Sequence, residues 1–149
     1  MEVKFKAVNQ KIGREIPLPQ FATAGSAAMD LHACVDAPVT LKAGERAVIP
    51  TGLAMALPSS GYVALVFARS GLGIKKGVCL SNGVGVIDSD YRGEIAVGLV
   101  NLSAEDYTVQ PGDRIAQLVI LPFLAAEFDE AEQLDDTVRG AGGFGSTGK

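Results

Sequence analysis

The sequence predicts a single antiparallel β domain, built as a sandwich or a barrel. Its 18 glycines and 7 prolines are spread along all 149 residues and divide the chain into short pieces. These pieces are rich in Val, Ile and Leu and have the length of strands. Almost no segment is long enough to form the helical crossovers that a parallel sheet requires. The chain therefore fits an all-β class better than an α/β class.

Four apolar runs are the clearest strand candidates, separated by turn sequences such as PSSG and QPGD. They cover residues 46–57 (RAVIPTGLAMAL), 62–68 (YVALVFA), 94–102 (EIAVGLVNL) and 113–123 (DRIAQLVILPF). Within the last two runs, AVGLV and LVILPF hardly alternate between apolar and polar residues. Such strands are buried on both faces, so we expect a second sheet and an interface between subunits.

Residues 123–139 (FLAAEFDEAEQLDDTVR) form the longest stretch without glycine or proline. Their Ala and Glu content favours a helix, but the apolar spacing is irregular and the second half is acidic. We expect a strand near residues 125–130, followed by a solvated linker that leads into a glycine-rich tail.

Composition and charge exclude several classes of function. The net charge of −4 gives no broad basic surface for stable nucleic-acid binding. The N-terminal residues lack the apolar core of a signal peptide, and no apolar run approaches the roughly 18 residues of a membrane helix. We therefore expect a cytoplasmic protein without a membrane partner. Cys34 and Cys79 lie in apolar runs without a CxxC motif, which predicts two buried free thiols.

The sequence contains one histidine, His32, and no metal-ligand spacing, so a structural zinc site or a histidine-based nucleophilic triad is excluded. The stretch MDLHACV has the alternation of a strand. It places Met29, Leu31 and Ala33 on one face and Asp30, His32 and Cys34 on the other. His32 is thus expected to be an ordinary residue of a polar face.

Polar residues that interrupt the apolar runs are candidates for a binding site. Arg69, Ser70 and Gly71 follow a strand in FARSGLG and could hold phosphate oxygens, although a turn with a surface arginine would look the same. Gln117 interrupts an apolar series, as a satisfied core amide also would.

The stretch SNGVGVIDSDYRGE (residues 81–94) has the pattern of a β-hairpin. Asn82 offers one acceptor and two donors, and nearby glycines allow close approach of the backbone to a ligand. Asp88 follows an apolar residue, which favours a raised pKa and the role of a base. An aspartate in a turn is also a common structural feature.

The C-terminal sequence TVRGAGGFGSTGK combines glycines with an arginine, an aromatic residue and two hydroxyl residues. Glycine content alone predicts disorder. An arm that closes over an anionic, aromatic ligand would use the other four, Arg139, Phe144, Ser146 and Thr147.

Taken together, these stretches resemble the five motifs of the trimeric dUTP pyrophosphatases (dUTPases), in the same order and over nearly the whole chain. The matching segments are AMDLHA (28–33), ARSGLG (68–73), NGVGVIDSDYRG (82–93), PGDRIAQL (111–118) and RGAGGFGSTG (139–148). One departure is Ala68, where the family usually has proline. This affects local rigidity more than chemistry, because the residues after it are retained.

The resemblance implies a jelly-roll homotrimer with three active sites shared between chains. A β domain (1–137) would carry a flexible C-terminal arm (138–149) that closes over the site. The reaction would be hydrolysis of dUTP to dUMP and pyrophosphate, which limits uracil incorporation into DNA and supplies dUMP for thymidylate synthesis. The cofactor would be Mg²⁺, held mainly by the phosphates without a direct protein ligand, with Asp30 acting through water.

The resemblance also implies a role for each matching residue. Asp88 would be the general base that orients water toward the α-phosphorus. Asn82 with the backbone of Gly85, Val86 and Ile87 would read uracil and exclude a thymine methyl group. Tyr91 would pack beneath the deoxyribose and exclude a ribose. The phosphates would be bound by Arg69, Ser70, Gly71 and Gln117, and the arm would contribute Arg139, Phe144, Gly145, Ser146 and Thr147.

Two alternatives differ from this function. A dCTP deaminase, or a bifunctional deaminase and dUTPase, shares the fold but uses a glutamate near the base, whereas this chain reads IDSDYRG there. A non-catalytic nucleotide-binding β module would bind without turnover. Pyrophosphate release, ammonia release or neither separates the three.

Overall fold

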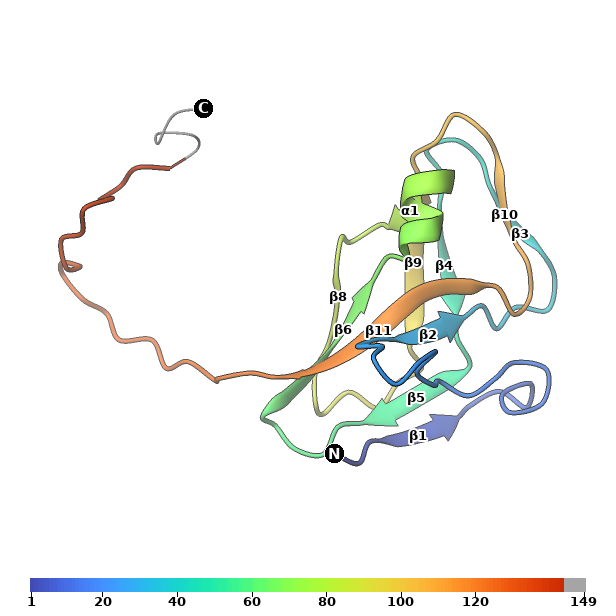
Figure 1. Cartoon of the computed structure of the whole chain (residues 1–149), viewed down its shortest axis with the longest axis horizontal. Coiled ribbons are helices and arrows are strands. Elements are labelled where there is room, and N and C mark those ends of the chain that lie inside the picture. Colours follow the sequence, from blue (N-terminus) through green and yellow to red (C-terminus); the bar gives the residue numbers. More distant parts are fainter. Residues whose placement is uncertain (144–149) are drawn as a thin grey trace.

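The computed structural model describes residues 1–143, and in this range eleven β-strands accompany one short helix. All pairs of named strands are antiparallel. The predicted all-β, antiparallel class is therefore confirmed. Figure 1 shows the strands gathered into one body, from which the C-terminal segment extends.

The largest sheet has four strands in the order β2 (Met29–His32), β11 (Arg114–Pro122), β6 (Tyr62–Phe67) and β8 (Gly85–Ile87). The long strand β11 lies between β2 and β6. Its residue Gln117 is paired with Asp30 on one side and Phe67 on the other. Residues distant in sequence therefore meet at one end of this sheet.

A three-stranded sheet contains β4 (Arg46–Pro50), β9 (Ala96–Asn101) and β7 (Val78–Leu80) in that order. Two smaller sheets complete the body (Figure 1). They pair β1 (Lys4–Ala7) with β5 (Leu53–Ala56), and β3 (Val39–Leu41) with β10 (Tyr107–Val109).

One cluster of buried apolar side chains joins the sheets. Leu31 and Leu118 enter it from the four-stranded sheet, and Ile49, Val97 and Leu99 enter it from the three-stranded sheet. This is the packing of a β-sandwich. Along β9, however, buried residues alternate with half-buried or exposed ones, and β11 becomes less buried toward its end. These strands are thus only partly covered within one chain, and the predicted subunit interface stays a prediction.

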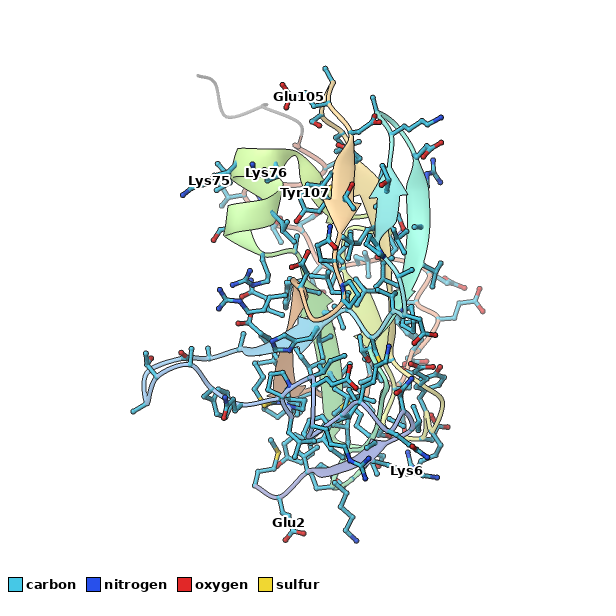
Figure 2. All side chains as sticks on the ribbon, turned by 90° about the vertical axis from the view of Figure 1, so that its right-hand side faces the viewer. Glu2, Lys6, Lys75, Lys76, Glu105 and Tyr107 are labelled. Atoms are coloured by element: carbon cyan, nitrogen blue, oxygen red, sulfur yellow. The ribbon has the colours of Figure 1, made fainter. Side chains whose placement is uncertain are left out.

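The helix α1 (Ser70–Lys76) occupies a stretch that the sequence suggested to be a turn. Its Leu72 is buried in the core, and its end is capped by Gly77, whose φ of 67° is left-handed and whose amide donates to the carbonyl oxygen of Leu72. Burial of one apolar side chain and the glycine cap explain why a helix forms despite two internal glycines. Figure 2 shows Lys75 and Lys76 at the opposite end of the body from Glu2 and Lys6.

The strand expected near residues 125–130 is absent, and that prediction was wrong. β11 ends at Pro122, and every residue from 123 to 141 is exposed. Figure 1 shows the segment leaving the body, so no strand lies beside it to accept its backbone hydrogen bonds.

The prediction of two buried thiols was correct for Cys34 and wrong for Cys79. Cys34 is buried although strand alternation had placed it with Asp30 and His32, because β2 ends at His32 and the amide of Cys34 turns to bond the carbonyl oxygen of Pro50. Cys79 is only half-buried, on the outer face of β7. Both thiols are free, as expected. No helix in residues 1–143 has the length and apolar character needed to cross a membrane.

Candidate active site

A pocket of about 270 Å³ opens between β8, the loop after it and the start of β9; we call it the β8 pocket. Five of the residues predicted to bind a ligand line it, together with the predicted base. These residues are Asn82, Gly85, Val86, Ile87, Asp88 and Tyr91. This stretch therefore forms one wall of a concave site.

The β8 pocket is not built on the predicted β-hairpin. β8 pairs with β6, with Gly85 opposite Val66, whereas β7 pairs with β9 in the other sheet. Residues 81–84 therefore form a turn that carries the chain from one sheet to the other. β7 pairs with β9 and β8 pairs with β6, and both of these partners are longer strands than β7 or β8. This explains why β7 and β8 do not form a hairpin with each other.

Asp88 lies where β8 ends, and its side chain is exposed in the single chain. Its carbonyl oxygen accepts a hydrogen bond of 3.2 Å from the amide of Tyr91, which closes a turn. The hydroxyl of Tyr91 donates to the carbonyl oxygen of Glu94 at 3.0 Å. These two bonds hold a carboxylate and an aromatic ring on the same pocket wall.

A second pocket, of about 520 Å³, lies at the end of the four-stranded sheet; we call it the β11 pocket. It contains Asp30 from β2, Arg69 and Ser70 after β6, and Arg114 and Gln117 from β11. The sheet order places these elements side by side. Arg69, Ser70 and Gln117, predicted from separate stretches, are thus brought together with Asp30.

Asp30 is bound by two arginines in the β11 pocket. Its Oδ1 accepts from Nε of Arg69 at 2.7 Å, and its Oδ2 accepts from an Nη of Arg114 at 3.3 Å. The side chains of Asp30 and Arg69 are only 23% and 24% exposed, against 56% for Arg114. Two guanidinium groups around one carboxylate leave one net positive charge, which favours an anionic ligand.

Gln117 is half-buried, and its amide nitrogen donates to the carbonyl oxygen of Ala68 at 2.9 Å. This bond fixes the side chain beside the end of β6, where Arg69 follows. The side-chain oxygen of Gln117 makes no hydrogen bond among the described residues. Gln117 is therefore a tethered amide at a pocket wall rather than a fully satisfied core residue.

Arg114 is the residue of this cluster that the sequence interpretation missed. Strict alternation would place Arg114 and Gln117 on opposite faces of a strand, since they are three residues apart. A register shift between Arg114 and Ala116 changes this, and both side chains line the same pocket. The sequence did contain a signal for Arg114, because this cation stands at the start of the predicted strand that also contains Gln117.

His32 is paired with Arg114 across the two strands. Burial lowers the pKa of His32 below its usual value; the carboxylate of Asp30 opposes this, and the charges of Arg114 and Arg69 add to it. His32 is thus held neutral beside the arginines, and its expected position on the more polar face of β2 agrees with the structure.

The remaining predicted residues are not among those that line the two pockets, or they lie outside the described range. Gly71 is exposed in the first turn of α1. Arg139 is exposed and belongs to a turn in which the amide of Gly140 donates to the carbonyl oxygen of Thr137. Phe144, Gly145, Ser146 and Thr147 lie outside the described residues.

The β8 pocket and the β11 pocket share no lining residue. One pocket offers an amide, a carboxylate and an aromatic ring, and the other offers guanidinium groups and a hydroxyl. The fold and the two pockets define an antiparallel β-sandwich protein with separate sites suited to a small polar ring and to an anion.

Comparisons with known proteins define the family. A family model described as dUTPase matches residues 14–148. A deoxyuridine 5'-triphosphate nucleotidohydrolase of Idiomarina loihiensis is 50% identical over 148 residues, which cover 99% of this chain and 98% of the relative. The protein of the same name from Desulfitobacterium hafniense is 53% identical over 146 residues, or 98% and 97% of the two chains. The chain belongs to the dUTPase family.

Solved structures of dUTPases have the same fold. A mutant dUTPase of Staphylococcus bacteriophage 80alpha, solved with dUpNHpp, is 26% identical, covers 99% of each chain and gives a TM-score of 0.86. A mutant dUTPase of phage phi11 of S. aureus is 23% identical, covers 91% of this chain and all of the other, and gives a TM-score of 0.79. The latter was solved to describe the coordination of a structural Mg(II) ion in that protein.

Proposed function

We propose that this chain hydrolyses dUTP to dUMP and pyrophosphate. One observation carries the proposal beyond family membership: Asn82, Asp88 and Tyr91 line one pocket, as a site for uracil, deoxyribose and an attacked α-phosphate requires. The relatives that are about half identical carry the name of this activity over nearly their whole length.

In this proposal, the β8 pocket selects the nucleoside. The amide of Asn82 and the backbone groups of Gly85, Val86 and Ile87 hydrogen-bond the edge of uracil, and the narrow turn leaves no room for a thymine methyl group. The ring of Tyr91 packs beneath the deoxyribose and excludes a 2′-hydroxyl. The pocket volume of about 270 Å³ suits a nucleoside rather than a larger ligand.

Asp88 acts as the general base. Its carboxylate takes a proton from a water molecule, whose oxygen forms a bond to the α-phosphorus. The bond between the α-phosphorus and the oxygen bridging to the β-phosphate breaks, and pyrophosphate leaves with that oxygen. Exposure of Asp88 at the pocket wall supports the role, because a water molecule can reach the carboxylate.

The β11 pocket binds the phosphates through Arg69, Ser70 and Gln117, together with Gly71 of α1. The net positive charge around Asp30 supports this assignment. The arm then closes over the substrate: Arg139, Ser146 and Thr147 bind the γ-phosphate, and Phe144 with Gly145 covers the uracil. Such a lid excludes water during the reaction and releases pyrophosphate afterwards.

The side chains of the described residues fit an Mg²⁺ ion that is held mainly by the substrate phosphates. Among residues 1–143, no group of three His, Cys, Asp or Glu side chains could hold a metal ion. Asp30 is engaged by two arginines, so it suits hydrogen bonding to metal-bound water better than direct coordination. When bound, the ion would neutralise phosphate charge and orient the triphosphate.

We also propose that the active protein is a homotrimer whose sites are shared between chains. The β8 and β11 pockets have no lining residue in common within one chain, whereas one dUTP must contact both sets of residues, which supports sharing. Exposed apolar residues of the strands, such as Val48 of β4 and Leu121 of β11, supply surface for contact. Two free thiols fit a reducing compartment such as the cytoplasm.

The test is turnover of dUTP, dTTP, dCTP and UTP by the purified protein, with pyrophosphate and ammonia measured in parallel. The proposal expects pyrophosphate from dUTP and little from the other three. Ammonia from dCTP would indicate a deaminase instead, and binding without either product would indicate a nucleotide-binding module.

A further inference from the structure

Glu94 holds the loop that carries Tyr91 onto the rest of the sandwich. Its Oε1 accepts a hydrogen bond of 2.7 Å from the amide of Gly52, just before β5. Its carbonyl oxygen accepts the bond of 3.0 Å from the Tyr91 hydroxyl. The backbone carbonyl of Glu94 therefore accepts the hydrogen bond from the Tyr91 phenol, and the Glu94 side chain holds this backbone in place.

The segment around Gly52, which the Glu94 side chain binds, is held firmly by its own hydrogen bonds and packing. Ile95 donates its amide to the carbonyl oxygen of Leu53 at 2.7 Å, and its own carbonyl oxygen accepts from the hydroxyl of Thr51 at 2.6 Å. Thr51 is fully buried. Gly52 has a left-handed φ of 71°, and a Cβ there would lie 2.8 Å from the sulfur of Cys34. The amide that Glu94 binds is thus fixed by packing on both sides.

Gly93 provides the space that the Tyr91 ring occupies. A Cβ at Gly93 would lie 2.4 Å from the Tyr91 hydroxyl oxygen and 2.6 Å from Cζ. The φ of Gly93 is not left-handed, so alanine would strain no backbone angle there. Alanine at this position would instead push the phenol away from the carbonyl oxygen of Glu94.

We propose that Glu94 is a positioning residue that sets the depth of the Tyr91 ring in the β8 pocket, and thereby the discrimination between deoxyribose and ribose. The inference rests on the proposed function, in which Tyr91 lies beneath the sugar. Glu94 acts through Tyr91, with Gly93 as the space that permits the arrangement. A ring displaced from the sugar would leave room for a 2′-hydroxyl.

The experiment compares four variants with the full-length wild type: Glu94→Ala, Glu94→Gln, Gly93→Ala and, as a matched control, Asp90→Ala. Asp90 belongs to the same loop and makes no hydrogen bond or ion pair within the described range, so its loss changes charge alone. Two quantities are measured: the ratio of kcat/KM for dUTP over UTP, and the NMR signal of Tyr91 in protein with ¹³C-labelled tyrosine, assigned with Tyr91→Phe.

We expect the dUTP/UTP ratio to fall about tenfold in Glu94→Ala and in Gly93→Ala, since pocket shape rejects a substrate with one added hydroxyl group by no more than about 100-fold. The Tyr91 signal should shift in both variants. Glu94→Gln should keep the ratio, because its side-chain oxygen still accepts from Gly52, and Asp90→Ala should keep both ratio and signal. Tm measurements control for loss of fold.

An unchanged ratio and an unchanged Tyr91 signal in Glu94→Ala would overturn the inference. So would an equal loss of discrimination in Glu94→Gln, which would show that the charge of Glu94 matters rather than its hydrogen bond. A wild type that does not hydrolyse dUTP would refute the proposed function, and the Tyr91 signal would still decide whether Glu94 positions the ring.

Discussion

Arg69 donates from Nε to Oδ1 of Asp30 at 2.7 Å, and this pair spans the middle strand of the largest sheet. Asp30 belongs to β2 and Arg69 follows β6, the two neighbours of β11. Gln117 of β11 is in register with Asp30 on one side and with Phe67, two residues before Arg69, on the other. An Nη of Arg69 also donates to the carbonyl oxygen of Arg114 at 3.5 Å, so the guanidinium is held by both β2 and β11 at the wall of the β11 pocket.

Asp30→Asn should therefore weaken catalysis although Asp30 touches no reacting atom. The neutral amide keeps the shape of the side chain but loses the charge-assisted bonds to both arginines. We expect kcat/KM for dUTP to fall about 10- to 100-fold, as for residues that orient a binding group. Steady-state kinetics check this, and wild-type kcat/KM in Asp30→Asn would show that the orientation of Arg69 does not depend on the carboxylate.

The lowered pKa of His32 predicts that the folded protein loses stability in mild acid. Burial lowers the pKa of His32 in the folded chain, so the unfolded chain binds a proton more readily. The associated stability is fully present above the unfolded pKa near 6.5 and is lost as the pH falls through the lower folded value. His32→Gln should therefore lose less Tm than the wild type between about pH 7 and pH 5. Parallel Tm profiles for the two proteins would contradict this account.

The C-terminal segment should be dispensable for folding and required for catalysis. Residues 123–141 are exposed, so deleting 138–149 should barely change the Tm without ligand. Turnover of dUTP should fall by at least about 100-fold, because charge stabilisation and water exclusion are both lost. Full activity of the truncated protein would show that the arm is only a chain end.

Phe144→Trp reports arm closure directly, because the natural chain contains no tryptophan. Its fluorescence should change on addition of dUpNHpp with Mg²⁺, and change far less with dUMP, which lacks the γ-phosphate. Equal responses to both ligands would indicate that closure does not depend on the triphosphate.

Shared sites predict rescue between two inactive variants. Sedimentation equilibrium should give three times the single-chain mass of 15.4 kDa. Mixing Asp88→Asn subunits with subunits that end at Thr137 should restore part of the activity, since some mixed sites combine an intact Asp88 with an intact arm. Absence of recovery after verified subunit exchange would show that Asp88 and the arm of one site belong to the same chain.

Strand composition and glycine spacing were enough to predict the all-β class, and polar residues within apolar runs pointed to several residues that line the two pockets. The stretch around Asp88 and the pair Arg69 and Gln117 were found because they interrupt apolar runs, which is a local signal. The contribution of Arg114 was missed, because strand alternation separates it from Gln117 and only the register shift in β11 brings both to one pocket.

Errors elsewhere came from interactions distant in sequence. The predicted hairpin at 81–94 failed because β7 and β8 pair with β9 and β6 rather than with each other. The strand near 125–130 failed because a strand needs a partner, and none lies beside it. Glu94 was overlooked because its importance lies in a hydrogen bond to Gly52, 42 residues away.

The central claim is that Asp88 directs water to the α-phosphorus of dUTP. The most direct measurement is hydrolysis in H₂¹⁸O, followed by mass spectrometry of both products, for the wild type and for Asp88→Asn. We predict one ¹⁸O atom in dUMP and none in pyrophosphate, with kcat of Asp88→Asn lower by about 10²- to 10⁴-fold and dUpNHpp binding retained. Label in pyrophosphate, or more than half of the wild-type kcat in Asp88→Asn, would contradict the claim.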